Sequence, residues 1–158
     1  MSRPARTQLS LYLYFHVCAR GNGGQHIFIE DADRRYYLSL VEKYFLRHKM
    51  QCFAYCLMTN HIHLLLLSPS IWRMSKAIHG MHTTYAKYFH KRYGQSGHLF
   101  QDRFSSWVVK DDAHLTFTKR YIENNPVGAE LVRDPKDYHW SSAWQGDERF
   151  VTICSVIG

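Results

Sequence analysis

The sequence has few cysteines, no long apolar run and no acidic residue over its central part. Its four cysteines, at positions 18, 52, 56 and 154, form no CxxC pair, so we expect buried thiols and no disulfide framework. The longest apolar run, around residues 64–67, is far shorter than the roughly 20 residues that cross a bilayer. Residues 1–11 are polar and basic and lack the apolar region of a signal peptide. We therefore expect a cytoplasmic protein without membrane contact.

The length and composition are those of one folded domain. The chain has 158 residues, of which 46% are hydrophobic, 15% aromatic and 21% charged. This mixture excludes a disordered tail or a collagen-like chain, and a domain of this length can bury a core without disulfides or metals. We expect a single domain over residues 1–158.

Positive charge is concentrated in the middle of the chain. The formal net charge is +7, and residues 43–101 contain eight Lys and Arg but no Asp or Glu. A basic stretch of this kind indicates a polyanionic partner such as nucleic acid, although it is also compatible with a solvated basic face that has no partner.

Local patterns in the first half of the chain predict, in chain order, a strand, a helix and two further strands. Residues 11–19 predict a strand that ends at the glycine turn of residues 20–24. Residues 32–48 have apolar side chains at helical spacing and predict an amphipathic helix, with Asp31 or Asp33 as its N-cap. Residues 51–58 and 61–67 predict a hairpin joined by a tight turn at Thr59 and Asn60.

The second half continues the alternation. Ser70 is the expected N-cap of a helix with one apolar stripe, which consists of Ile71, Met74, Ile78, Met81, Tyr85 and Tyr88. Residues 99–109 predict a fourth strand, and Asp111 or Asp112 caps a third helix that must end before Pro126. The order β-α-β-β-α-β-α predicts an α+β fold, a ferredoxin-like (RRM-like) antiparallel sheet with helices on one face plus a C-terminal helix. The other sheet face would then be free for a ligand.

Two patterns carry chemistry. In Asn60-His61-Ile62-His63, strand alternation places His61 and His63 on one face, where two imidazoles can share a metal if a third ligand is present. On the last predicted helix, Tyr121 and Asn125 are four residues apart and project from one face. Each pattern alone is also compatible with ordinary surface or packing residues.

Together these residues resemble a known family, the single-tyrosine HUH transposases, and within it the REP-associated tyrosine transposases of bacteria. The resemblance extends over nearly the whole chain. It rests on Arg20-Gly21-Asn22, Gln25-His26-Ile27-Phe28, Met58-Thr59-Asn60-His61-Ile62-His63, Phe100-Gln101-Asp102-Arg103-Phe104, Tyr121-Ile122-Glu123-Asn124-Asn125-Pro126-Val127 and Asp137-Tyr138-His139-Trp140-Ser141-Ser142.

The resemblance implies a role for each site residue. Tyr121 is the expected catalytic nucleophile, and His61, His63 and Asn125 are the expected metal ligands, so that the C-terminal helix is the catalytic helix. The insertion-sequence branch usually has Gln four residues after the tyrosine, whereas the REP-associated branch resembles this chain in having Asn there. The implied metal is Mg²⁺ or Mn²⁺, although an imidazole pair by itself would also suit zinc, copper or nickel.

The implied function is that of a transposase-like endonuclease and strand transferase. It would cleave and rejoin single-stranded DNA next to palindromic (REP-type) hairpins through a 5′-phosphotyrosine, in the cytoplasm at the nucleoid. A homodimer that shares active sites is an alternative to a monomer. The candidate DNA contacts are Arg20, Asn22, Lys76, Lys87, Lys91, Arg103, Lys119 and Arg120, and bases could stack on Tyr12, Tyr14, Trp72, Phe104 or Trp107.

Two other classes fit the sequence less well. A domesticated, catalytically inactive protein that binds single-stranded DNA or RNA hairpins would keep the basic face but could lose the metal ligands or the tyrosine, all of which are present here. The second class is a metal-dependent hydrolase that uses a bound water, or an RNA-binding module of the same fold. RNA-recognition sheets have an aromatic-rich strand motif, which this chain lacks at the usual spacing.

Overall fold

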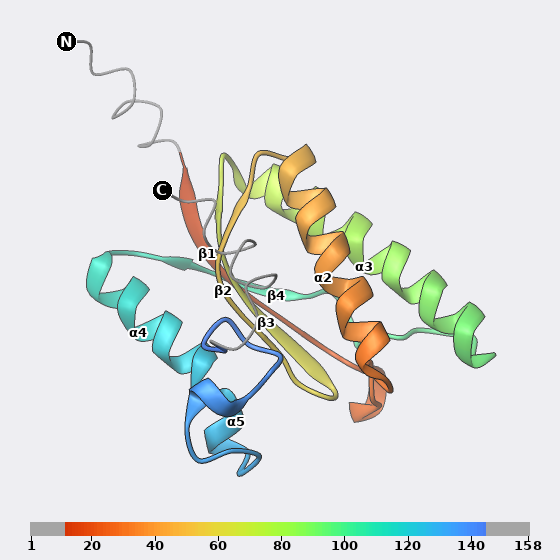
Figure 1. Cartoon of the computed structure of the whole chain (residues 1–158). Helices are drawn as coiled ribbons and strands as arrows, with labels where there is room; N and C mark the ends of the chain where they lie inside the picture. Colours follow the sequence, from red (N-terminus) through yellow and green to blue (C-terminus); the bar gives the residue numbers. More distant parts are fainter. Residues whose placement is uncertain (1–11, 145–158) are drawn as a thin grey trace.

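A four-stranded antiparallel sheet forms the centre of the protein (Figure 1). The structure, a computed structural model, describes residues 12–144. The strands are β1 (Leu13–Arg20), β2 (Gln51–Leu57), β3 (His61–Ser68) and β4 (Ser105–Val109). Their order is β2-β3-β1-β4, with β1 and β3 in the middle. This arrangement confirms the predicted α+β, ferredoxin-like antiparallel sheet.

Helices cover both faces of the sheet, in different ways. Helices α2 (Asp31–Arg47) and α3 (Ile71–Tyr93) lie side by side on one face (Figure 1). Helix α4 (Asp112–Glu123) lies against β2 and β3 on the other face, and the short α5 (Asn125–Gly128) follows it directly. The predicted pair of helices on one face and the separate last helix are therefore confirmed, and α4 occupies part of the face that was expected to be open.

Strand alternation divides the core into two parts. On β1, Phe15, Val17 and Ala19 are buried toward α2 and α3, where they join the main apolar cluster. A smaller cluster lies under α4, and it consists of Ala54, Cys56, Met58, Leu65, Val109 and Ile122. Because burial of an apolar side chain stabilises the fold by about 1.5–3 kcal/mol, Ile122 fixes α4 to the sheet and sets the direction of the other α4 side chains.

Most predicted helix ends and apolar stripes are confirmed. Ser70 and Asp111 are the N-caps of α3 and α4, and each side-chain oxygen accepts a backbone N–H. In α2, the predicted stripe is buried except for the partly exposed Tyr44, whereas in α3 Ile71 is exposed. Among the cysteines, Cys52 and Cys56 are buried and Cys18 is partly buried, while Cys154 lies outside the described residues.

Two boundary predictions are wrong. The N-cap of α2 is Glu30, and the side chain of Asp33 at the third helical position accepts the backbone N–H of Glu30 in a capping box. The fourth strand begins at residue 105 instead of 99, because Asp102 adopts a positive φ of 27° and breaks the extended backbone. Residues 99–104 therefore form an irregular segment at the sheet edge, and Phe100 forms a bridge with Gly21, the residue after β1.

Glycine is required at the turn after β1. A Cβ atom at Gly21 would lie 2.0 Å from the carbonyl oxygen of Gln25, so no other residue fits without a backbone shift. The Gly21 N–H donates to the carbonyl of Asn60 at 2.8 Å and the Asn22 N–H to that of Leu99 at 2.8 Å. The turn thus joins the ends of β1 and β3 to the segment that precedes β4.

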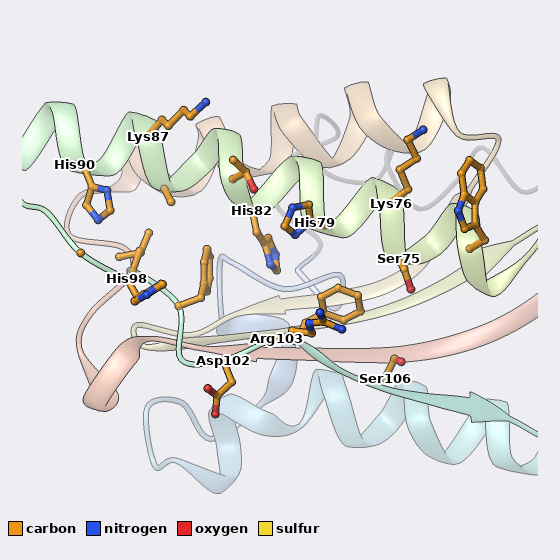
Figure 2. Close-up of a pocket in the computed structure, with 17 residues that line it drawn as sticks. Ser75, Lys76, His79, His82, Lys87, His90, His98, Asp102, Arg103 and Ser106 are labelled. Carbon is orange, nitrogen blue, oxygen red and sulfur yellow. The ribbon is translucent and has the colours of Figure 1, made fainter.

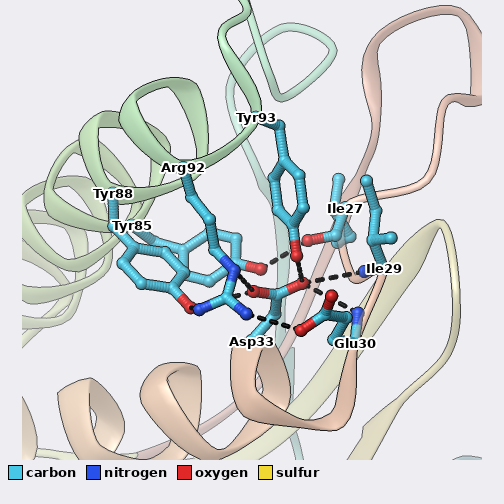
Figure 3. A network of polar contacts seen from close by, with 8 residues as sticks. All are labelled: Ile27, Ile29, Glu30, Asp33, Tyr85, Tyr88, Arg92 and Tyr93. Carbon is cyan, nitrogen blue, oxygen red and sulfur yellow. Dashed lines mark hydrogen bonds and ion pairs between the residues drawn. The ribbon is translucent and has the colours of Figure 1, made fainter.

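A buried carboxylate ties α2 to α3 (Figure 3). Asp33 is fully buried, and its Oδ2 accepts the N–H groups of Ile29 and Glu30, each at 2.9 Å, and the Tyr93 hydroxyl at 2.5 Å. Its Oδ1 accepts the Tyr88 hydroxyl at 2.8 Å. Burial alone would raise the pKa of Asp33, but these hydrogen bonds to the ionised form outweigh it and the pKa is lowered.

Replacement of Asp33 by Asn is expected to lower the free energy of unfolding by about 3 kcal/mol at pH 7, because an amide N–H₂ then faces buried donors. For a domain of this size that loss corresponds to roughly 6–12 °C in Tm, measured by circular dichroism.

Since the native pKa of Asp33 is below 3.8, the wild type should lose this stabilisation as pH falls below about 4. Asp33→Asn should show a weaker dependence there. The exposed Asp31→Asn is the control, and equal melting of both variants would contradict the role of Asp33.

No helix within residues 12–144 is both long and apolar enough to span a membrane.

Candidate active site

A polar cavity lies on the α4 face of the sheet, between β1, β3, β4 and α4. Its volume is about 370 Å³. The side chains of His16, Arg20, His63, Trp107 and Tyr121 line it, together with the irregular segment before β4. The alternation of β1 and β3 explains this lining, because every second residue of each strand points toward α4.

The structure brings His61, His63 and Asn125 together. The Nε2 atom of His61 lies 3.2 Å from Asn125 Oδ1, and the Nε2 atom of His63 lies 3.4 Å from Asn125 Nδ2. The centroids of the two imidazole rings are 5.2 Å apart. Asn125 reaches them because α4 ends at Glu123 and the chain turns into α5 with Pro126 in its first turn. The two histidines and the amide, predicted from separate parts of the sequence, therefore form one cluster.

The Nδ1 atoms of both imidazoles, which do not face Asn125, have hydrogen-bond partners elsewhere. The Nδ1 atom of His61 lies 2.8 Å from Asn60 Oδ1, and the Nδ2 atom of the same amide contacts the Gly24 carbonyl at 3.5 Å, which orients its oxygen toward His61. The Nδ1 atom of His63 lies 3.0 Å from His16 Nε2. If each Nδ1 carries the ring proton, both Nε2 lone pairs are directed at Asn125.

Both imidazoles are held neutral. Burial, followed by the neighbouring His16, His61 and Arg20, lowers the pKa of His63 to about 3. Burial is also the largest effect on His61 and lowers its pKa, although the protonated ring would donate from Nε2 to Asn125 Oδ1, which raises the pKa. With Nδ1 of His61 protonated, its Nε2 lone pair faces the Asn125 oxygen, so two acceptors oppose each other across 3.2 Å. A cation between them would satisfy both, and the donor set therefore fits a divalent metal.

Tyr121 lies next to this cluster within the same chain. Its side chain is 50% exposed, and its ring centroid is 5.7 Å from that of His63 and 5.9 Å from that of His16. Helix α4 places Tyr121 here because the adjacent Ile122 is buried against the sheet. One chain thus contains the tyrosine, both histidines and the amide.

The sequence analysis did not single out His16. This residue projects from β1 toward α4, and it contacts both His63 and Trp107, with ring centroids 5.2 and 5.1 Å away. Burial and then His114 lower its pKa. The alternation of residues 13–20 indicates which face His16 occupies, but its proximity to His63 depends on the pairing of β1 with β3.

The predicted DNA contacts fall into three groups. Arg20 and Arg103 line the polar cavity, and Asn22 is exposed in the adjoining turn η1 (Asn22–Gly24). Lys119 and Arg120 are exposed on α4, where Lys119 pairs with Glu123 at 3.1 Å. The three lysines of α3 lie on the other side of the sheet from Tyr121, and they are Lys76, Lys87 and Lys91.

The predicted stacking residues differ in exposure. Trp72 and Trp107 are exposed, and Trp107 lines the polar cavity. Tyr12 and Tyr14 are partly buried, and Tyr14 makes an edge contact with Phe53. Phe104 packs against the main core while still lining a groove beside α3. Trp72 and Trp107 therefore have the most surface available to a ligand.

Within residues 12–144, no cluster of three or more His, Cys, Asp or Glu side chains could hold a metal ion. The cluster described above has two histidines, and its third donor is the amide of Asn125.

Comparison with known proteins identifies the family. The model of the family described as "Transposase IS200 like" matches residues 10–125, which include β1 to β4, α4 and Asn125. This chain belongs to the IS200-like transposase family, a class of DNA-processing enzymes, as the resemblance predicted. A search of curated proteins found no match.

Two solved structures share the fold. One is a REP-associated tyrosine transposase bound to a REP hairpin, which has a TM-score of 0.62 and 16% sequence identity over 85% of each chain. The other is a candidate transposase from Deinococcus radiodurans R1, with a TM-score of 0.51 and 16% identity over 72% of this chain and 90% of that chain. Both confirm the fold predicted from the order of strands and helices.

Proposed function

We propose that this protein is a REP-associated type of tyrosine transposase, which cleaves and rejoins single-stranded DNA next to palindromic hairpins. The observation that carries the proposal is the convergence of Tyr121, His61, His63 and Asn125 at one polar cavity. The family model and the shared fold with a transposase bound to a REP hairpin support it.

The proposed reaction transfers a phosphoryl group to Tyr121. Its hydroxyl oxygen attacks the scissile phosphorus and loses its proton, while the bond from phosphorus to the 3′ oxygen breaks. The products are a 5′-phosphotyrosine and a free 3′-OH. Attack by another 3′-OH reverses the step and joins strands without ATP or water. A free tyrosine has a pKa near 10, so forming the phenolate at pH 7 costs about 4 kcal/mol, which the site must offset.

The residues around Tyr121 would position the scissile phosphate and the metal. Arg20 and Arg103 line the same cavity and provide positive charge for a bound phosphate. His61, His63 and Asn125 would hold Mg²⁺ or Mn²⁺, and such an ion would polarise a phosphoryl oxygen and neutralise developing charge. His16 and Asn60 orient the two imidazoles through their Nδ1 atoms. Since all of these groups come from one chain, a monomer contains a whole site.

The test is covalent capture of DNA. The protein is incubated with Mn²⁺ and single-stranded DNA that carries palindromic repeats from its own genome, labelled at either the 5′ or the 3′ end. We expect the 3′ label to migrate with the protein on a denaturing gel, because a 5′-phosphotyrosine retains the 3′ part of the strand. The 5′ label should appear in a shorter fragment with an extendable 3′-OH.

Each other outcome has a definite meaning. A protein adduct that carries the 5′ label would establish the opposite polarity and contradict the mechanism. A shorter fragment without any adduct would indicate hydrolysis by water. Hairpin binding without cleavage, at every Mn²⁺ and Mg²⁺ concentration, would identify a binding-only protein.

A further inference from the structure

A second, larger cavity runs along α3 (Figure 2). It lies between one side of this helix and residues 97–106, and its volume is about 960 Å³. Lys76, His79 and Lys87 of α3 form one wall, and Arg103 and Phe104 belong to the other. We call this cavity the α3 groove. Apart from Arg103, the proposed phosphoryl transfer uses no residue of α3 or of this groove.

The α3 groove is strongly basic. Helix α3 contains five Lys and Arg residues and no Asp or Glu. Among residues 12–144, no carboxylate lies within 4.0 Å of the side-chain nitrogens of Lys76, Lys87 or Arg103. The lining has a single carboxylate, that of Asp102. Cations without a neutralising partner in a concave surface attract a polyanion.

The groove adjoins the polar cavity on the α4 face of the sheet. Asp102 and Arg103 line both, since the irregular segment before β4 passes between them. Arg103 therefore stands at the junction between the α3 groove and the cavity that contains His63 and Tyr121. A ligand that extends along the groove past Arg103 reaches the proposed nucleophile.

Exposed aromatic surface favours a single strand over a duplex. Trp72, at the start of α3, is 63% exposed, and Lys76 Nζ lies 4.7 Å from its ring centroid. A planar ring next to a cation can stack a base while the cation meets the adjoining phosphate. In a duplex the bases are already stacked and unavailable, whereas an unpaired strand presents them.

We propose that the α3 groove binds the single-stranded DNA that flanks the hairpin and leads it past Arg103 to the scissile phosphate. This proposal rests on the proposed function. It assigns Lys76 and Lys87 to phosphates of the unpaired strand and Trp72 to one of its bases.

The test compares two fluorescein-labelled DNA probes by fluorescence anisotropy over a range of salt concentrations. One probe is a palindromic hairpin from the genome of the source organism with single-stranded flanks of about 10 nucleotides, and the other is the same hairpin without flanks. Lys76→Gln/Lys87→Gln should weaken binding of the flanked probe roughly tenfold. It should also make the slope of log affinity against log salt about 1.4 less negative, since two phosphate contacts on a single strand are lost.

Trp72→Ala should weaken binding of the flanked probe by a similar factor without changing the salt slope, because stacking involves no counterion release. Neither groove variant should alter binding of the unflanked hairpin. The control Lys43→Gln/Lys136→Gln removes the same charge from exposed sites elsewhere and should leave both probes unaffected. Melting curves of all variants verify that they fold.

Equal losses on the flanked and unflanked probes would show that the groove holds the duplex, and unchanged affinity in the groove variants would show that it holds no DNA. Either result overturns the proposal while leaving the proposed function intact. Failure of the proposed function is recognised separately in the covalent-capture experiment, because the wild type would then form no 3′-labelled adduct, whatever the groove variants do to binding.

Discussion

Tyr121→Phe is expected to abolish the covalent protein–DNA adduct and to lower the cleavage rate by at least roughly 10⁴-fold. The phenylalanine ring can keep the contacts with His16 and His63, whose centroids are 5.9 and 5.7 Å away, but it has no oxygen to attack phosphorus. Hairpin binding should change little. Denaturing gels measure the adduct, and mass spectrometry of the digested adduct identifies the modified residue.

The matched control for this variant is Tyr14→Phe. Tyr14 projects from β1 on the same sheet face and packs against Phe53, so the substitution removes a hydroxyl from the same layer of the protein. Its adduct should form at the wild-type level. Adduct formation by Tyr121→Phe would assign the nucleophile to another residue, and loss in both variants would indicate a general disturbance of the α4 face.

His61→Ala is expected to weaken Mn²⁺ binding by more than about 100-fold, because even residues behind the ligands of a metal contribute 10–100-fold to its affinity. His61 is partly exposed at the start of β3, so the fold should tolerate the substitution. Isothermal titration calorimetry without DNA measures the effect independently of catalysis. Cleavage should fall in parallel, with activity recovering only at much higher Mn²⁺ concentration.

His48→Ala is the control for metal binding. His48 follows α2 and stacks on Tyr44, on the other side of the sheet from the cluster. The His48→Ala variant should bind Mn²⁺ with wild-type affinity. Equal Mn²⁺ affinity in His61→Ala and the wild type would remove His61 from the ligand set. If the variants His63→Ala and Asn125→Ala also bound Mn²⁺ with wild-type affinity, the metal would have to lie elsewhere.

Much of the fold was predictable because its signals are local. The largely apolar run of residues 61–67 and the spacing of Met74, Ile78 and Met81 are properties of single elements, and the observed strand and helix follow them. Residues 99–109 were predicted as one strand because their composition suits a strand. The backbone instead turns at Asp102, a local conformation that residue type alone does not indicate.

The candidate site was predictable in its components and not in its assembly. His61 and His63 share a face by strand alternation, and the motif around Tyr121 and Asn125 marks the family. His16 was missed because its proximity to His63 arises from the register of β1 against β3, which aligns Cys18 with His63. The α3 lysines were predicted as DNA contacts, but the sequence did not indicate that two of them line a groove that shares Arg103 with the polar cavity beside Tyr121.

The sequence by itself determined the class of this protein. The order of its elements, the basic segment without carboxylates and the histidine and tyrosine motifs follow from residue types at fixed spacings. Only the tertiary structure decided how these parts meet: that Asn125 reaches both imidazoles within one chain, and that the α3 groove adjoins the polar cavity beside Tyr121. The physical reason is that such contacts join residues more than 40 positions apart, and strand register and helix packing set their distances.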